Sequence, residues 1–311
     1  MERFLNRIIC GDCIEVLPRI GGVADLIFAD PPFNIGSKYD KYHDKVGRES
    51  YIAWTEEWMT ACYGVLKKHG SFYIAIADEY AANVKIIADG LGLFMRNWIV
   101  WHYTFGQQMK KKFARSHTHI LYFVKDKKNF TFNDYAVRVP SDRQLVYNDK
   151  RANPAGKMPD DVWDQYPRVC GTFKEREGWH PCQMPESLLR RIIAASSNRG
   201  DCVLDPFSGS GSTAAAAWQL GRDYVGVEIS EKYAEHARRR LAQLKEQRPD
   251  SSFLSANELN EVKRLAGDME IAAAKIAGDE KLLAIFTNQF AVRMNNGRKY
   301  RAEEIATALR D

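Results

Sequence analysis

The sequence predicts an α/β fold in which helices cover both faces of a mostly parallel, doubly wound sheet. Short, continuous apolar runs, typical of strands buried on both faces, alternate with segments whose apolar residues recur at helical spacing. Near residue 250 this alternation stops and only helical patterns follow. We therefore predict a sheet domain over residues 1–248 and a small helical C-terminal domain over residues 249–311.

The first half of the chain is organised around the buried strand expected over residues 26–29. This strand must stop at Asp30, because Pro31 and Pro32 cannot donate to a strand ladder. A shorter strand precedes it over residues 7–12. Beyond it we expect helices over residues 51–66 and 78–91, a helix-stopping glycine at Gly70, and strands over residues 70–77, 96–103 and 118–124.

The second half begins with residues 130–178, which are polar and lack periodicity. Residues 180–185 then open a helix that runs to about residue 197. A buried strand over residues 202–205 leads through a glycine-rich turn into an alanine-rich helix over residues 213–220, and another strand follows over residues 223–228. A strand, turn, helix and strand in this order are typical of Rossmann-like sheets.

Composition excludes some classes of protein. Six scattered cysteines do not form the dense framework of a small secreted domain, and we interpret Cys10 and Cys13 as packing residues rather than metal ligands. No apolar run reaches membrane-spanning length, so we expect a cytoplasmic, nucleoid-associated protein without a membrane partner. The net charge of +5 permits a polyanionic partner. Basic residues gather between residues 110 and 128, where they either bind phosphates or form a solvated loop.

The strand end at Asp30-Pro31-Pro32-Phe33 is the first candidate site. Open α/β sheets bind their ligands at the carboxyl ends of strands. A carboxylate and a nearby main-chain carbonyl can accept both hydrogens of an exocyclic amino group, which frees the lone pair of that nitrogen. The two prolines fix the turn, and Phe33 offers a face on which an extruded base can stack. The alternative is a capped strand end with a solvated Asp30.

The second candidate site is the glycine-rich turn between residues 205 and 213. Gly209 and Gly211 permit a close approach of the backbone to a ligand, and the following helix N-terminus offers unpaired N–H groups. Glu228 ends the next strand and can accept hydrogen bonds from ribose hydroxyls. Taken alone, this block fits a nicotinamide cofactor as well as a methyl donor.

Both sites resemble those of one family. Asp-Pro-Pro-Phe at residues 30–33 is similar to the catalytic tetrapeptide of S-adenosylmethionine-dependent amino-methyltransferases of DNA, and Asp-Pro-Phe-Ser-Gly-Ser-Gly at residues 205–211 is similar to their Asp-Pro-Phe-x-Gly-x-Gly motif. The catalytic block precedes the cofactor block, as in the permuted β group. The resemblance implies a class I methyltransferase fold with S-adenosylmethionine as cofactor.

The resemblance also implies roles for single residues. His180 and Gln183 belong to His-Pro-Cys-Gln-Met-Pro, which is similar to the family's His-Pro-Thr-Gln-Lys-Pro beside the cofactor. It places a target-recognition segment at about residues 129–178, and the long loop over residues 35–50 is expected to be a lid or to contact the substrate. The predicted catalytic residues are Asp30, Pro31, Pro32 and Phe33, and the predicted cofactor-binding residues are Asp12, His180, Gln183, Asp205, Pro206, Phe207, Gly209, Gly211, Thr213 and Glu228.

We predict methylation of N6 of an adenine flipped out of double-stranded DNA, because cytosine-N4 enzymes more often carry Ser-Pro-Pro-Tyr. Cytosine N4 is the main alternative; a protein-amide methyltransferase, a DNA-binding subunit without catalysis and a nicotinamide enzyme are others. Cys182 follows a proline, as does the nucleophile of cytosine-C5 enzymes, but it lies at a helix entry rather than in a strand-end loop. The resemblance is compatible with restriction-modification, and thus with a cognate restriction endonuclease or a homodimer as partner.

Overall fold

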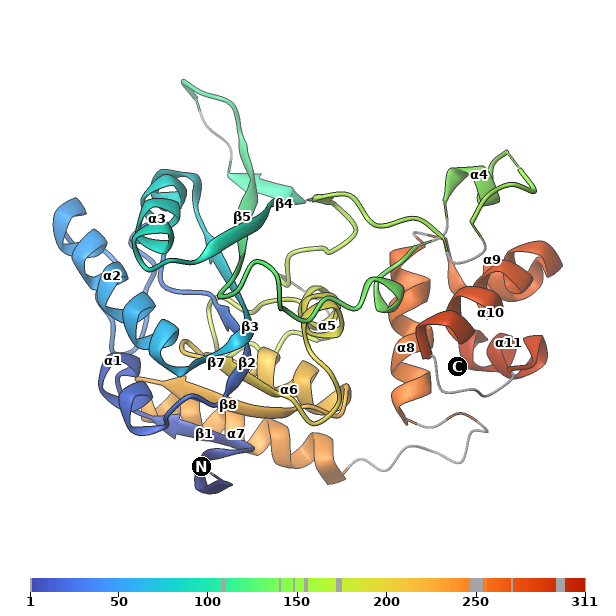
Figure 1. The fold of residues 1–311 in the computed structure, drawn as a ribbon. Helices are drawn as coiled ribbons and strands as arrows, with labels where there is room; N and C mark the ends of the chain where they lie inside the picture. The colour runs from blue at the N-terminus through green and yellow to red at the C-terminus, as the bar shows by residue number, and fades with distance from the viewer. Residues whose placement is uncertain are drawn as a thin grey trace. The chain divides into compact units, whose positions relative to one another are not determined.

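The computed structural model describes residues 2–107, 110–139, 141–147, 149–153, 156–171, 175–246, 254, 256–269, 271–294 and 300–310. The chain folds as two compact units (Figure 1). The first unit comprises Met1–Thr131 and Asp161–Glu246, and the second comprises Phe132–Asp160 and Gln247–Asp311. The predicted boundary between the two domains, at residues 248 and 249, lies outside the described residues.

The first unit is built on an eight-stranded sheet. Its strands are β1 (Arg7–Cys10), β2 (Ala24–Ala29), β3 (Leu66–Ile76), β4 (Phe94–Gln107), β5 (Arg115–Val124), β6 (Val162–Trp163), β7 (Cys202–Asp205) and β8 (Asp223–Glu228). Their order is β1-β8-β7-β2-β3-β5-β4-β6. The pairs from β1 to β3 are all parallel, whereas β5 is antiparallel to both β3 and β4. The predicted mostly parallel sheet is confirmed.

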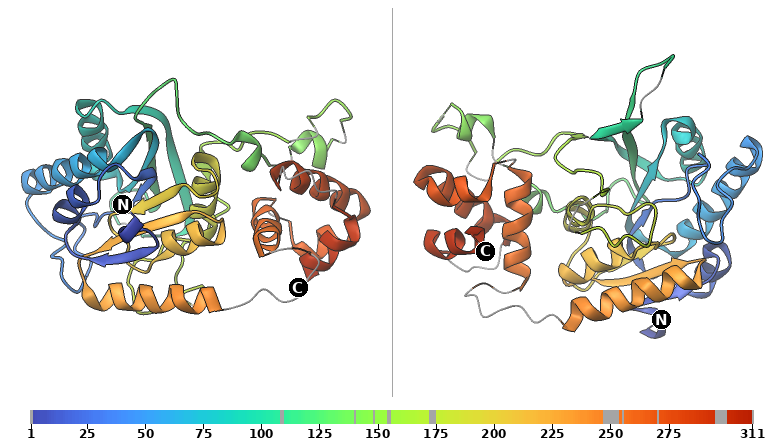
Figure 2. Two further views of the ribbon diagram at one scale, coloured as in Figure 1. Left: turned by 60° about the horizontal axis from the view of Figure 1, so that its bottom comes forward. Right: turned by 180° about the vertical axis from the view of Figure 1, so that it is seen from behind.

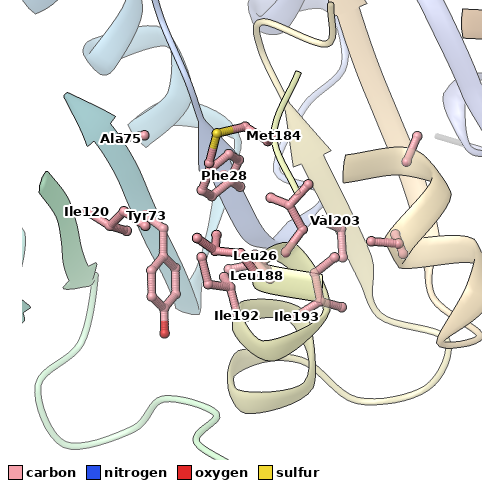
Figure 3. Packing of buried hydrophobic residues seen from close by; sticks show 14 of the residues in the cluster. Leu26, Phe28, Tyr73, Ala75, Ile120, Met184, Leu188, Ile192, Ile193 and Val203 are labelled. Carbon is pink, nitrogen blue, oxygen red and sulfur yellow. The ribbon is translucent and has the colours of Figure 1, made fainter. Parts of the chain in front are cut away.

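Helices cover both faces of this sheet (Figures 1 and 2). They are α1 (Cys13–Val16), α2 (Arg48–Val65) and α3 (Asp78–Gly90) on one face, and α5 (Glu186–Ser196), α6 (Ser212–Gln219) and α7 (Glu231–Glu246) on the other. Alternate residues of β2 point to opposite faces, as a strand requires. Leu26 and Phe28 pack with Leu188 and Ile192 of α5 (Figure 3), while Ile27 belongs to the core under α2.

Four neighbouring strands of the sheet bring acidic residues to one edge. Asp205 and Glu228 are the last residues of β7 and β8, Asp30 directly follows β2, and Asp12 follows β1. Because these strands are parallel, their carboxyl ends meet at the same edge. The edge therefore collects the carboxylates of both candidate sites.

The predicted helix stop at Gly70 is wrong, since Gly70 lies inside β3. The reason is Asp25, a buried carboxylate in β2. It pairs with Lys67 Nζ at 2.8 Å and with His69 Nε2 at 2.9 Å. These contacts hold residues 66–70 alongside β2, so α2 ends earlier and β3 begins earlier than the apolar pattern indicates.

The basic residues between 110 and 128 do not form one cluster. Residues 110–112 precede β5, and Lys125, Lys127 and Lys128 follow it, so the ten-residue strand separates the two groups by about 30 Å. Lys125 has a structural role, because its Nζ donates to the carbonyls of Tyr63 and Leu66 at 2.8 Å. Only the first group lies at the edge of the sheet that holds both candidate sites, because the start of β5 lies beside the end of β3.

The second unit contains the C-terminal helices α8 (Ala256–Asp268), α9 (Ala273–Gly278), α10 (Glu280–Met294) and α11 (Ala302–Arg310), in the region where the sequence predicts a helical appendage. It also contains the short helix α4 (Asp142–Leu145), and Leu145 packs against the core formed by residues such as Leu265 and Phe286. Part of the predicted target-recognition segment therefore shares a core with the C-terminal helices. No helix among the described residues is long and apolar enough to cross a bilayer.

Candidate active site

Two adjoining pockets open at the carboxyl edge of the sheet. The first, which we call the donor pocket, lies over the ends of β1, β8, β7 and β2. The second, the acceptor pocket, lies beside the Asp30 turn and is walled by residues of β4 and β5 and by the loop around Arg168. Asp30, Tyr39, Cys182 and Met184 line both pockets.

Most of the predicted site residues line one of these pockets. The donor pocket is lined by Asp12, Asp30, Pro32, His180, Asp205, Pro206, Phe207, Gly209, Thr213 and Glu228. The acceptor pocket is lined by Asp30, Pro31, Phe33 and Gln183. The Gln183 amide is tied to its own loop, since it accepts from the Glu177 amide at 2.9 Å and donates to the Glu175 carbonyl at 2.6 Å. Gly211 lines neither pocket and is the N-cap of α6.

The glycine-rich turn packs closely against His180 and Glu228. Gly209 has a φ of +47°, in the left-handed region that favours glycine, and a Cβ there would lie 2.9 Å from the His180 imidazole. Its amide donates to Glu228 Oε2 at 2.8 Å, and Ser230 N donates to Glu228 Oε1 at 2.9 Å. The turn and the acidic strand end therefore form one fixed unit at the floor of the donor pocket.

The turn that carries Asp30 is also held rigidly. Tyr51 Oη donates to the Pro32 carbonyl at 2.6 Å. Asn34 has a φ of +58°, and its backbone N–H donates to the buried carboxylate of Asp44 at 2.6 Å. The same carboxylate accepts from the Ser37 amide at 2.8 Å, so the chain is fixed on the far side of the turn as well.

Burial alters the ionisation of the carboxylates in the site. The pKa of Asp30 is raised to about 7, mainly by burial and also by the charge of Asp205, against the lowering effect of Arg168. Burial likewise raises the pKa of Asp205 to about 7. Perturbed carboxylates that face one cleft are typical of catalytic sites.

Comparison with known proteins identifies this arrangement. The DNA methylase family matches residues 24–239, which include both candidate sites. The chain belongs to the DNA methylase family. It is 41% identical over 268 residues to the DNA adenine methyltransferase YhdJ of Escherichia coli, covering 83% of this chain and 87% of that protein. It is 34% identical over 305 residues to the type II methyltransferase M.HpaI of Haemophilus parainfluenzae, covering 97% of this chain and 91% of that protein.

Solved structures share the fold of this DNA methylase. The complex of TTHA0409 from Thermus thermophilus with S-adenosyl-L-methionine matches with a TM-score of 0.56 at 23% identity, covering 78% of this chain and 95% of that one. The class I methyltransferase fold is thus confirmed. Family membership confirms the predicted resemblance, and with it S-adenosylmethionine as the methyl donor.

A cysteine that lines both pockets of the methylase lies in an environment that disfavours the nucleophilic thiolate. Tyr39 Oη donates to Cys182 Sγ at 3.7 Å. Burial raises the pKa of Cys182, so the thiol keeps its proton at neutral pH. Because a thiolate is the nucleophilic form, this environment argues against attack by Cys182 on a base.

Several lining residues were not predicted individually. Tyr39 and Asp40 lie in the loop that the sequence predicts to contact the substrate, and Asp40 accepts from Ser230 Oγ at 2.6 Å. Trp54 and Tyr233 also line the donor pocket. Their helical spacing indicates only that they face the interior, so no sequence signal distinguishes them from core residues.

Proposed function

We propose that the protein methylates N6 of an adenine that is flipped out of double-stranded DNA. The observation that carries the proposal is the position of Asp30, which lines both pockets. A donor bound in one pocket and a base bound in the other would meet at this carboxylate. Bringing the two reactants together in line supplies much of the rate acceleration that such a transfer requires.

The donor pocket fits S-adenosylmethionine. Glu228 can accept hydrogen bonds from ribose hydroxyls, and Gly209, which lines the same pocket, carries no side chain that would cover its backbone. Asp12, which follows β1, also lines this pocket, where its carboxylate can accept from the amino group of the cofactor's adenine. When bound, S-adenosylmethionine supplies a methyl group on a positively charged sulfur.

The Asp30 turn would activate the amino group of the base. Asp30 accepts one amino hydrogen, and we assign the other to the Pro31 carbonyl, because Tyr51 already donates to that of Pro32. These two bonds localise the lone pair on the nitrogen, which attacks the methyl carbon as the carbon–sulfur bond breaks, without a covalent enzyme intermediate. The nitrogen then loses one proton, which the Asp30 carboxylate can accept. Phe33 lines the acceptor pocket, where its ring can stack on the extruded base.

The choice of adenine over cytosine rests on Asp30, since cytosine-N4 enzymes more often carry serine at this position. The test is to incubate the protein with labelled S-adenosylmethionine and unmethylated plasmid DNA, and to identify the modified nucleoside after digestion. We expect N6-methyladenine. N4-methylcytosine would overturn the base assignment while keeping the mechanism, and a lack of product despite cofactor binding would overturn DNA as the substrate.

We further propose that the segment over residues 129–178 reads the target sequence. Its part nearest the site, around Arg168 and Gly171, lines the acceptor pocket. Exchanging residues 132–160 with those of a relative of different sequence specificity should move methylation to another site, as read by sequencing the modified plasmid. A chimera that keeps the original site would contradict the assignment.

Gly209→Ala should weaken the binding of S-adenosylmethionine about tenfold, since a Cβ on this strained backbone collides with the imidazole of His180. Isothermal titration measures the effect. Gly200→Ala is the matched control: its φ is +81°, but a Cβ there meets nothing within 4 Å. Gly200→Ala should lose stability but keep its affinity for S-adenosylmethionine. Equal affinities of Gly209→Ala and Gly200→Ala for this cofactor would contradict a cofactor role for the Gly209 turn.

Arg168→Ala should move the acid limb of the pH–activity profile to higher pH. The charge of Arg168 lowers the pKa of Asp30, so its removal raises that pKa and leaves less of the ionised, hydrogen-bond-accepting form near neutrality. Activity should fall several-fold below the pKa of about 7 and recover at alkaline pH. Arg168→Lys, which keeps the charge, should retain the original profile; a uniform loss at every pH would contradict the electrostatic role.

A further inference from the structure

The hairpin between β4 and β5 ends in a tip that the site described above does not use. Residues 110–114 are all exposed, and Phe113 is 99% exposed, more than any other large hydrophobic residue of the described chain; Tyr147 follows with 74%. An aromatic side chain stabilises a fold by leaving water, so Phe113 contributes almost nothing to the core. Its ring is free to contact a ligand.

The tip lies close to the acceptor pocket. Because β5 is antiparallel to β3, its first residues stand at the edge of the sheet that holds the site. Arg115, His117 and Thr118 of β5 and Trp101 and Tyr103 of β4 line the acceptor pocket. Phe113 precedes Arg115, a residue of the pocket wall, by two residues, so the Cα atoms of these two residues lie at most about 7 Å apart. The hairpin extends outward from the sheet (Figure 1).

The positive charge of the tip indicates the kind of partner that it binds. Lys110, Lys111 and Lys112 are exposed and form no ion pair within the described part of the chain. Three adjacent cations favour a polyanion and oppose pairing with the same tip of a second copy. Arg115, by contrast, is engaged by Asp78 at 2.9 Å. A basic, aromatic tip at the rim of a base pocket therefore matches the backbone and the stacked bases of DNA.

We propose that this tip is a wedge that opens the DNA duplex. Its three lysines contact backbone phosphates, and the Phe113 ring enters the base stack beside the target, in the space that the extruded base vacates. Proteins that distort DNA insert apolar side chains between bases in this way, and the inserted ring offsets part of the unstacking cost. The proposal rests on DNA methylation as the function of the site.

The test compares two duplexes that carry the site which the wild type methylates on plasmid DNA. One is fully paired, and the other lacks the base opposite the target, so that extrusion costs less. Phe113→Ala should lower kcat/KM about tenfold on the paired duplex, the size expected for one lost stacking contact. It should come close to the wild type on the duplex with the missing base. Phe113→Trp, which keeps a stacking ring, should retain activity on both.

The remaining outcomes overturn the wedge. Equal activity of Phe113→Ala and the wild type on the paired duplex would show that the ring is not used, and an equal loss on both duplexes would assign it to general binding. A change in sedimentation coefficient of Phe113→Ala would assign the ring to self-association. If the wild type methylates no DNA at all, the proposed function fails first, and the two failures are thus distinguished.

The lysines are tested by the salt dependence of binding to the paired duplex. Each phosphate contact contributes about 0.9 to the slope of log Kd against log salt. A triple variant, Lys110→Ala, Lys111→Ala and Lys112→Ala, should reduce this slope by about 2–3. The matched control is Lys127→Ala with Lys128→Ala, at the opposite end of β5, which should leave the slope unchanged. A triple variant with an unchanged slope would contradict phosphate contact by the tip.

Discussion

Replacing Asp30 with asparagine should abolish methylation and make the protein more stable above neutral pH. The asparagine side chain has one acceptor oxygen in place of two, and its NH2 group is a donor that cannot accept a hydrogen bond from the amino group of the base. Loss of a group that orients and polarises the reacting atom lowers kcat by at least about 100-fold. Affinity for S-adenosylmethionine should be retained, since the donor pocket keeps its other lining residues.

The stability gain follows from the pKa of Asp30, which burial raises from 3.8 to about 7. A carboxyl group whose pKa is higher in the folded state contributes stability below its unfolded pKa, and this contribution is lost as the pH rises through 7. The ionised Asp30 therefore destabilises the fold at alkaline pH, and more so because Asp205 is nearby. Asparagine removes that cost, which should raise the free energy of unfolding at alkaline pH by about 1–3 kcal/mol.

Urea denaturation at pH values on either side of the Asp30 pKa measures this effect. The difference in stability between Asp30→Asn and the wild type should grow with pH and level off above about pH 8. Asp126→Asn is the control, because Asp126 is a surface carboxylate whose pKa is lowered by hydrogen bonds from the Lys128 and Asn129 amides. Asp126→Asn should show no gain in the free energy of unfolding at alkaline pH. An Asp30→Asn variant that is less stable at all pH values would contradict the assigned ionisation.

The sequence predicts the strands that hold the site better than the pockets that they form. β7 and β8 have the predicted bounds, and β2 differs by two residues at its start, because continuous apolar runs between polar turns define buried strands. β3 begins four residues early, since a buried carboxylate on a different strand, Asp25, fixes the residues before it. Such a long-range contact leaves no local pattern.

The acceptor pocket illustrates the same limit. Trp101 and Tyr103 carry the alternation of a buried strand, and both are buried, but this pattern does not reveal that they also wall a pocket. Arg168 comes from a segment without periodicity, and its influence on Asp30 exists only in the folded chain. Motifs predict the candidate reacting groups, whereas the fold alone brings together the groups that surround them.

The second unit makes this dependence on tertiary contacts testable, through Arg293. Its side chain is fully buried and pairs with Glu261 and Asp268 at 3.2 Å, and it donates to the Arg138 carbonyl. Arg264 pairs with the same two carboxylates. Two cations thus balance two anions inside the unit, and they link the C-terminal helices to the segment over residues 132–160.

Arg293→Ala should destabilise the second unit by about 3–5 kcal/mol, because it leaves one buried carboxylate without a counterion and one carbonyl without a donor. All seven tryptophans belong to the first unit, so tryptophan fluorescence reports that unit alone. The part of the helical circular dichroism signal that comes from the second unit should therefore be lost at a lower temperature, and proteolytic cleavage after residue 246 should become faster. The transition seen by tryptophan fluorescence should stay in place.

The double variant Arg293→Met with Asp268→Leu separates charge balance from packing. It removes one cation and one anion together, and Arg264 and Glu261 still neutralise each other. Replacing a buried ion pair by apolar residues of similar size is often neutral, so most of the lost stability should return. If the double variant is as unstable as Arg293→Ala, the pairing of charges is not what holds residues 132–160 against the helices, and the bond to the Arg138 carbonyl would carry that role instead.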